Sequence, residues 1–238
     1  MPTQIEALLE VQDHDTRLDQ LRHQLAELPA RTERDEAREA LSGVSAAIEA
    51  AEAERADLSR DQRRLDDEIE TLSTKRKQEE TALYGGAITN ARELQDLQEE
   101  ITSIGRRITQ LEDRDLEFME KIEPIDASLA ELATRRATAT EVLAGAEQRL
   151  IAAEAELAVA LEQAEAARSS IAGEVPADLL AEYEALRVGN GGVGVARLTG
   201  SQCGGCHLGL SAVELSRVRK MGPGEVTHCE ECGRLLVA

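Results

Sequence analysis

The residues with the clearest chemistry are four cysteines arranged as two CxxC pairs, Cys203 with Cys206 and Cys229 with Cys232. A CxxC pair places two thiolates on one tight turn, and two such turns can close a tetrahedral site around Zn²⁺. Four sulfur ligands leave no open coordination position, so the pattern favours one structural zinc ion over a catalytic metal.

Two other uses of the cysteines compete with zinc. Disulfides are typical of secreted proteins, and Met1 to Leu9 has neither the basic region nor the apolar stretch of a secretion signal. A redox CxxC would be expected within a βαβ pattern, which the sequence lacks. His207 and His228 flank the pairs as alternative ligands. We expect them instead to form hydrogen bonds near the site.

A short basic helix is predicted between the two cysteine pairs. Ser211 and Glu214 have the spacing of a capping box, which predicts a helix running to Met221. The cations of this segment are Arg217, Arg219 and Lys220. Many zinc ribbons contact nucleic acid, so these cations are a candidate nucleic-acid site. Without interleaved aromatic residues they make a weak footprint, and a solvated helix face explains them as well.

The composition of the 238 residues is that of long helices, with abundant Ala, Leu, Glu, Arg and Gln and only 1% aromatic residues. The formal net charge is -20, and the charges from Thr199 onward balance, so the helical part carries the whole surplus. An acidic surface of this kind repels nucleic acid and anionic membranes. No segment approaches the roughly 18 consecutive apolar residues of a membrane span. We therefore expect a cytoplasmic protein with no membrane partner.

Heptad repeats predict three long helices, at about 3–28, 32–83 and 91–170. The repeat is strongest in the third, where only Asp115 and Arg136 interrupt two apolar rows. The rows are Leu94, Ile101, Ile108, Ile122, Leu129, Leu143, Leu150 and Leu157, and Leu97, Ile104, Leu111, Phe118, Ile125, Leu132, Ala139, Ala146, Ala153 and Ala160. A repeat sustained this long predicts supercoiling against a partner helix.

The breaks between these helices predict an antiparallel hairpin. Pro29 disfavours helix at the preceding residue, and Gly85 and Gly86 end the second helix. Asn90 is a good N-cap for the third helix. At 1.5 Å per residue the second helix spans roughly 78 Å and the third roughly 120 Å. The first helix has the length needed to cover the difference.

These signals predict an all-α antiparallel coiled-coil rod with a small C-terminal zinc ribbon of short β hairpins and one short helix. The predicted domains are a coiled-coil hairpin at 1–175 with its turn at 84–90, a short helix and glycine-rich hinge at 176–198, and a C4 zinc ribbon at 199–238. The hinge prediction rests on the run from Gly189 to Gly194, since glycine-rich segments are typically flexible.

The turn from Leu83 to Gln95 and the ending from Cys203 to Leu236 resemble those of bacterial C4-type zinc ribbon proteins with an N-terminal coiled coil, a family long described as a domain of unknown function. The resemblance extends over essentially the whole chain. It implies zinc at the four cysteines and a rod with Tyr84 to Asn90 at its tip. It also implies an adaptor or regulator that contacts an alternative sigma factor, flagellar or secretion components, or RNA.

The tip has residues that turn geometry does not explain. Gly85, Gly86 and Asn90 suit the turn, whereas Tyr84 and Ile88 are apolar side chains at an exposed end. We therefore predict a partner-binding tip at Tyr84, Ile88 and Asn90. We expect a non-enzymatic adaptor that binds proteins of transcription or secretion machinery, with no small-molecule substrate. The alternative is a regulator that binds RNA or DNA through the ribbon.

Overall fold

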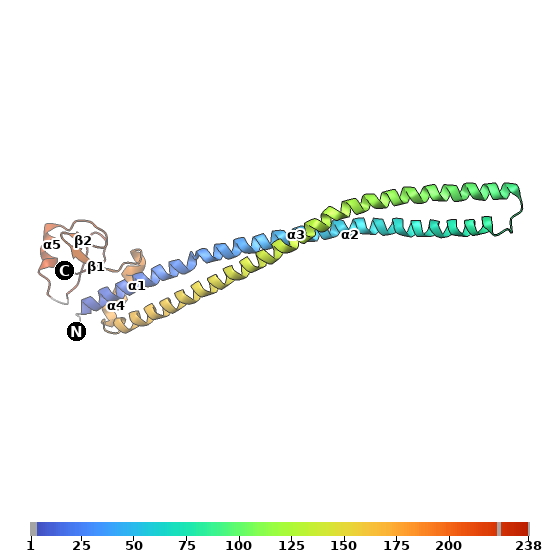
Figure 1. Ribbon diagram of the computed structural model, residues 1–238. Coiled ribbons are helices and arrows are strands. Elements are labelled where there is room, and N and C mark those ends of the chain that lie inside the picture. The colour runs from blue at the N-terminus through green and yellow to red at the C-terminus, as the bar shows by residue number, and fades with distance from the viewer. Residues whose placement is uncertain (1–3, 223–224, 238) are drawn as a thin grey trace. The chain divides into compact units, whose positions relative to one another are not determined.

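The computed structural model describes residues 4–222 and 225–237, and confirms a helical coiled coil with a small strand-containing ribbon (Figure 1). Its elements in chain order are α1 (Gln4–Ala26), α2 (Pro29–Tyr84), α3 (Ala91–Ala172), α4 (Ala177–Gly189), β1 (Val195–Thr199), β2 (Gln202–Cys203), α5 (Ala212–Arg219), β3 (Thr227–His228) and β4 (Leu235–Val237). No helix among these residues is long and apolar enough to cross a membrane.

The chain forms two compact units. The hairpin unit is Glu33–Ala146, and the base unit combines Met1–Thr32 with Glu147–Ala238. The base unit therefore contains α1, the end of α3, α4 and the whole ribbon.

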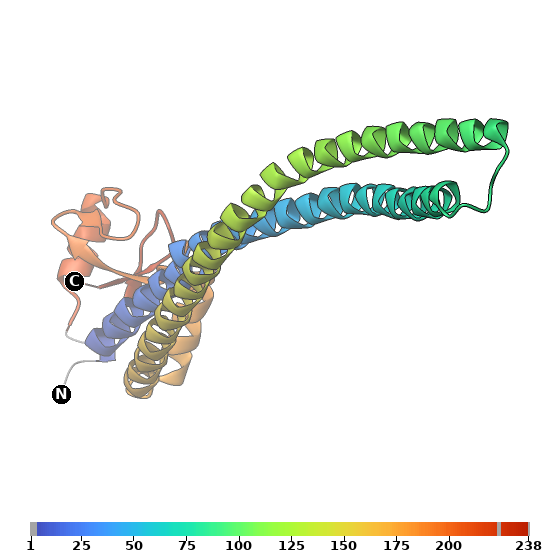
Figure 2. The ribbon, with the colours of Figure 1, turned by 45° about the vertical axis from the view of Figure 1, so that its right-hand side comes forward.

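In the hairpin unit, α2 and α3 run side by side in opposite directions in both views (Figures 1 and 2). Ion pairs link them along their length. Lys75 Nζ lies 2.6 Å from Glu100 Oε1, and Arg107 Nη2 lies 2.8 Å from Glu68 Oε1. Arg55 of α2 also pairs with Asp126 of α3.

The seam between α2 and α3 follows the heptad rows. Leu111 is fully buried and Leu132 is 9% exposed. In α3, Arg136 occupies a row position but is exposed, because its long side chain can carry the charge out of the seam. Asp115 stays half-buried, and its Oδ1 has no hydrogen-bond partner among the described residues.

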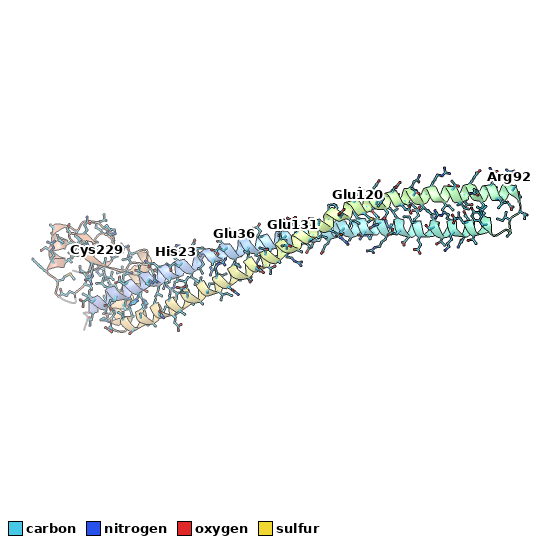
Figure 3. The ribbon with its side chains drawn as sticks, viewed as in Figure 1. His23, Glu36, Arg92, Glu120, Glu131 and Cys229 are labelled. Atoms are coloured by element: carbon cyan, nitrogen blue, oxygen red, sulfur yellow. The ribbon has the colours of Figure 1, made fainter. Side chains whose placement is uncertain are left out.

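The loop between α2 and α3 is held by backbone geometry and by one cap. Gly86 has a φ of 73°, which lets the chain turn away from the end of α2. Asn90 Oδ1 accepts from the backbone N–H of Arg92 at 3.0 Å, so Asn90 caps α3. Figure 3 places Arg92 at this end of the hairpin unit.

In the base unit, α1 packs against the last part of α3. The break near Pro29 is short, with Glu27 and Leu28 between α1 and α2. Leu18 and Leu21 of α1 are buried against Ala164 of α3. This contact agrees with the length argument that the first helix covers the end of the third.

The ribbon strands form one four-stranded sheet in the order β2-β1-β4-β3. β1 is antiparallel to β2 and parallel to β4, while β3 is antiparallel to β4. One side of the sheet joins the main core of the base unit. That core contains Ile5, Ala7, Leu8 and Val11 of α1, Val175, Tyr183 of α4, Val195 of β1, and Leu235 and Val237 of β4.

β1 begins at Val195, inside the segment predicted as a hinge. The glycine-rich run before it is also bonded to α1. Gln12 Nε2 donates to the Gly192 oxygen at 2.9 Å, and Gln12 Oε1 accepts from the Gly194 N–H at 2.7 Å. The ribbon thus packs on α1 and α4, where the sequence led us to expect a flexible connection.

Candidate zinc centre

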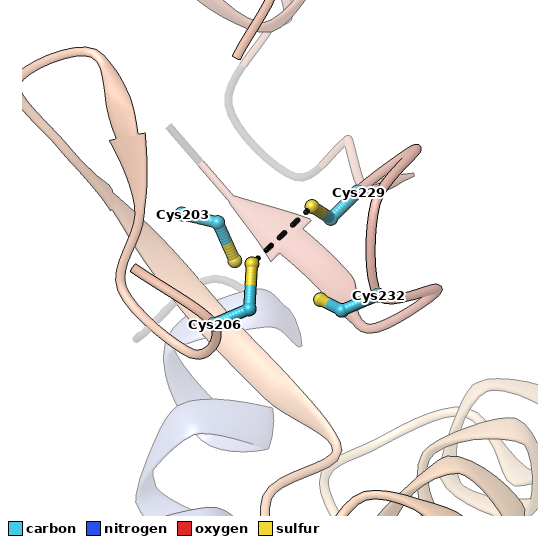
Figure 4. A group of neighbouring side chains, drawn as sticks. All are labelled: Cys203, Cys206, Cys229 and Cys232. Atoms are coloured by element: carbon cyan, nitrogen blue, oxygen red, sulfur yellow. Dashed lines mark hydrogen bonds between the residues drawn. The ribbon is translucent and has the colours of Figure 1, made fainter. Parts of the chain in front are cut away.

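The four cysteines lie on two turns at one end of the sheet. Cys203 ends β2 and Cys206 follows in the turn, while Cys229 follows β3 and Cys232 precedes β4. Their side chains point toward one another (Figure 4), and the four sulfurs all lie within 4.8 Å of one another. Cys206 Sγ and Cys229 Sγ are 4.0 Å apart. Zn–S bonds of about 2.3 Å place the sulfurs of a tetrahedral site about 3.8 Å apart, so this spacing fits Zn²⁺.

The two turns share one backbone pattern. The Cys203 oxygen accepts from the His207 N–H and the Cys229 oxygen from the Gly233 N–H, each at 2.8 Å. His207 and Gly233 both have positive φ, 61° and 72°. His207 is therefore the turn residue equivalent to a glycine, and its side chain is exposed.

The cysteine sulfurs differ in burial and in the pKa of their thiols. Cys203 and Cys229 are buried, and burial raises the pKa of the Cys229 thiol to about 12. Burial acts in the same direction at Cys232, but hydrogen bonds from the backbone and side chain of Arg234 lower its pKa to about 7. Burying several thiolates together is costly unless a cation neutralises them. A divalent ion would supply that charge.

The helix α5 is fixed to the second turn by a buried carboxylate. Ser211 Oγ accepts from the Glu214 N–H at 3.2 Å, which confirms Ser211 as the predicted N-cap. Glu214 is 2% exposed, and its Oε1 accepts from the Glu230 N–H at 3.0 Å. The side of the sheet that faces the cysteines is completed by Ala196, Val218 and Leu236.

The other predicted site residues lie away from the sulfurs. His228 Nε2 is 2.7 Å from Glu182 Oε1 of α4, as expected for a neighbour that forms hydrogen bonds. Arg217 pairs with Glu230 at 3.1 Å, and Arg219 donates to the Gly200 oxygen at 3.3 Å. Lys220 is exposed at the C-cap of α5.

The predicted tip residues belong to the hairpin unit, whereas the cysteines and α5 belong to the base unit. Tyr84 is 80% exposed, Asn90 is exposed and Ile88 is half-buried. The candidate partner-binding residues and the candidate zinc ligands therefore belong to different units of the chain.

Two structural residues near the centre carried no sequence signal. Arg234 donates from Nε to the Val193 oxygen at 3.0 Å and from Nη2 to the Asn190 oxygen at 2.7 Å. Gln12 holds the same segment from α1. A polar residue in an amphipathic helix and an arginine after a CxxC pair are too common to single out.

A buried carboxylate joins α1, α3 and α4 beside this segment. Tyr183 donates to Asp15 Oδ2 at 2.7 Å, and Arg168 Nε donates to Asp15 Oδ1 at 2.8 Å. Arg187 lies 3.7 Å from the same carboxylate. Burial and the adjacent Asp15 raise the pKa of Tyr183 well above its usual range, so the phenol remains a donor at neutral pH.

A helical hairpin joined to a four-cysteine ribbon defines a class of zinc-ribbon protein, and both parts match known families. Residues 11–191 match the CT398-like coiled coil hairpin domain, and residues 202–236 match the C4-type zinc ribbon domain. The chain belongs to the family of CT398-like coiled-coil hairpin proteins. The ribbon match and the sulfur spacing fit one structural zinc ion, held by Cys203, Cys206, Cys229 and Cys232.

Similar proteins cover nearly the whole chain. The chain is 32% identical over 232 residues to the uncharacterized protein Rv2229c of Mycobacterium tuberculosis, covering 97% of this chain and 94% of that protein. It is 30% identical over 222 residues to the uncharacterized protein ML1638 of Mycobacterium leprae, covering 93% of this chain and 94% of that protein.

Solved structures show the same fold. A Mycobacterium smegmatis protein matches with a TM-score of 0.88 and 26% identity over 100% of both chains. CT398 from Chlamydia trachomatis matches with a TM-score of 0.70 and 19% identity, over 98% of this chain and 97% of that one. HP0958 from Helicobacter pylori matches with a TM-score of 0.51 and 18% identity, over 100% of this chain and 99% of that one. The modules and the fold fit a structural or binding protein.

Proposed function

We propose that the protein is a non-enzymatic adaptor that binds partner proteins through the loop end of the hairpin unit and through the ribbon. The zinc ion has a structural role in this proposal. The observation that carries it is Tyr84, which is 80% exposed where α2 ends. An exposed aromatic ring is unexpected in a chain with only two tyrosines, one phenylalanine and no tryptophan.

The loop around Tyr84 is suited to present a contact surface. Gly86 and the Asn90 cap set the path of the backbone, and Ile88 adds a half-buried apolar side chain. Tyrosine is enriched among the residues that dominate protein–protein affinity, because it offers a large contact area with few rotatable bonds. Tyr84 and Ile88 are therefore the proposed anchors.

The alternative is nucleic-acid binding by α5, whose cations lie on the surface of the ribbon. Arg217 is already paired with Glu230, and Arg219 already donates to a carbonyl. Phosphate contacts would have to replace these bonds. The acidic surplus of the helices also opposes a polyanion. Both features support a protein partner.

The proposal is tested by affinity capture from native lysate, with and without nuclease, followed by mass spectrometry. Tyr84→Ala is compared with the parent and with Leu116→Ala, which removes an exposed leucine from α3 of the same unit. Cys229→Ser tests the ribbon. The proposal expects partners that survive nuclease, are lost with Tyr84→Ala or Cys229→Ser, and are kept with Leu116→Ala.

The opposite results would favour the alternative. Partners that disappear with nuclease would point to RNA or DNA. Binding to a nucleic-acid probe that weakens steeply with salt, and on changing Arg217, Arg219 and Lys220 to alanine, would then assign the contact to α5.

A further inference from the structure

A groove of about 560 Å³ lies between α2 and α3 within the hairpin unit. One wall comes from residues 37–47 of α2 and the other from residues 132–142 of α3. On the α2 wall, Ala40, Gly43 and Ala47 are all exposed. On the α3 wall, Val142 is 54% exposed. The groove is therefore a largely apolar surface open to solvent, and none of its residues belongs to the tip loop or the ribbon.

The residues that line the groove form one line on each helix. Within each line they are three and four residues apart, the spacing that places side chains on one face of a helix. They are Ala40, Gly43 and Ala47 on α2, and Arg135, Thr138 and Val142 on α3. Two such lines with a hollow between them suit a third helix, because a ridge of side chains on one helix packs into the groove beside another.

The side chains beside the seam differ here from those nearer the loop. Nearer the loop they form ion pairs between the two helices, such as Lys75 with Glu100. Arg135 is the one charged residue that lines the groove, and it has no ion-pair partner in the described part of the chain. The remaining side chains are neutral and mostly small. The seam residues Val44 and Ala139 are half-buried and also line the groove, so a third helix could cover them.

A glutamate stands at each end of the groove. Glu36 precedes Ala40 by four residues, and Glu131 precedes Arg135 by four residues, so each continues the line of its own helix. Because α2 and α3 are antiparallel, the two glutamates lie at opposite ends, and Figure 3 shows them at different points along the helix pair. Both are exposed, and neither forms an ion pair with another described residue. The groove ends therefore favour cations.

The distance between these ends sets the length of the ligand. Arg55 pairs with Asp126, so Glu131 is level with about residue 50 of α2. About 14 residues of α2 then separate Glu36 from that level, or roughly 21 Å at 1.5 Å per residue. A helix of about four turns has this length.

A second copy of this chain is a poor occupant. Two copies of the same hollow face would meet with empty space between them, which close packing disfavours. The formal net charge of -20 also makes two copies repel. A separate helix with an apolar stripe and basic ends fits both the shape and the charge of the groove.

We propose that this groove binds an amphipathic helix of a partner protein. The helix is about four turns long and presents apolar side chains at positions i, i+4, i+7 and i+11 to the groove. Lys or Arg side chains near its two ends pair with Glu36 and Glu131. The proposal deepens the adaptor function by naming a class of partner. It uses no residue of the tip loop or the ribbon, so the two proposals can fail separately.

The test uses the zinc-loaded full-length protein and a fluorescent helical peptide of about 18 residues, with binding followed by anisotropy. The peptide has leucine at i, i+4, i+7 and i+11, alanine and glutamine at the other positions, and lysines at both ends. One comparison peptide has glutamates in place of the lysines. The other keeps the lysines and the composition but scrambles the leucine positions. We expect the lysine peptide to bind about tenfold more tightly than either.

Filling the groove locates the binding site. A Cβ at Gly43 would meet no neighbouring atom within 4 Å, and glutamine favours helix more than glycine does, so Gly43→Gln should fold normally. Gly105→Gln in α3 is the matched control, because a Cβ there also meets no neighbouring atom within 4 Å. We expect Gly43→Gln to weaken binding of the lysine peptide about tenfold or more, and Gly105→Gln to leave it unchanged.

Charge reversal tests the two ends. Glu36→Lys with Glu131→Lys should weaken binding of the lysine peptide about fivefold or more, since two attractive contacts become repulsive. The control is Glu70→Lys with Glu120→Lys, exposed acids of the same unit that change the net charge equally. Helix content is checked by circular dichroism for every variant.

Three results would each overturn the groove proposal. The first is no binding of the lysine peptide to the unaltered protein. The second is equal binding of the scrambled peptide, which would mean general attraction to an acidic protein. The third is undiminished binding to Gly43→Gln. Tyr84→Ala separates the two proposals, because it should lose the captured partners of the tip and still bind the lysine peptide.

Discussion

Arg234 Nη2 donates to the backbone oxygen of Asn190 at 2.7 Å, which ties the second cysteine turn to the end of α4. Asn190 is the C-cap of α4, and Arg234 comes two residues after Cys232. The same guanidinium bonds the Val193 oxygen. One side chain therefore links the second cysteine turn to the chain between α4 and β1.

Removing this side chain should loosen the segment that it holds. For Arg234→Ala we expect faster amide exchange across residues 190–194, and a loss of about 1.5–3 kcal/mol in the local opening free energy, because two charge-assisted hydrogen bonds disappear. Hydrogen exchange with mass spectrometry measures this directly. Arg197→Ala is the control, since Arg197 is an exposed arginine of β1. Equal effects of the two changes would contradict the assignment.

Removing zinc should destabilise part of α1 as well as the ribbon. Val195, Leu235 and Val237 pack on Ile5, Leu8 and Val11 of α1, on the side of the sheet away from the cysteines. With a chelator, we expect amides of β1, β4 and the start of α1 to lose protection from exchange, because metal binding and folding are coupled.

The hairpin unit serves as the internal control for that experiment. Residues 33–146 have their own seam and ion pairs, so their exchange and helix signal should persist without zinc. Full protection of α1 after chelation would mean that the ribbon's packing does not stabilise α1. Loss of protection throughout the hairpin unit would mean that the two units unfold together.

Asp15 should be among the most sensitive positions of the base unit. Asp15→Ala leaves Arg168 and Arg187 without their shared carboxylate and removes the acceptor of Tyr183. Deleting one partner of a buried ion pair typically costs about 3–5 kcal/mol.

The matched control is Asp13→Ala, two residues earlier on the exposed side of α1, with an expected change of about 0.5 kcal/mol or less. Urea unfolding, together with amide exchange in the base unit, measures the loss of stability for each of the two variants. A similar, small effect of the two substitutions would show that the buried network contributes little to stability.

The parts of the structure that the sequence predicted are those with short-range signals. Heptad spacing indicated the seam of α3, and Asn90 indicated the start of that helix. The CxxC spacing identified the metal centre, because only two residues separate the two ligands of each turn.

The parts that were not predicted depend on partners far along the chain. Gln12 bonds to residues 180 and 182 positions away, and Tyr183 bonds to Asp15 across 168 positions. Long-range contacts also explain why the structure differs from the hinge prediction. Glycine composition predicts a flexible segment at 189–194, whereas hydrogen bonds from Gln12 and Arg234 hold that segment in place. Arg136 was placed in the core by its heptad position but is exposed. Heptad position specifies the face of the helix and does not determine how far a long side chain extends.

The parallel pairing of β1 with β4 also orders events during synthesis. β4 is the last of the described elements in chain order, yet it lies inside the sheet and packs against α1, the first. On the ribosome, α2 and α3 can pair before β4 has been made, while α1 still lacks its apolar contacts with β4. In a nascent chain, Leu8 and Val11 therefore lack part of their core until Leu235 and Val237 emerge from the ribosome.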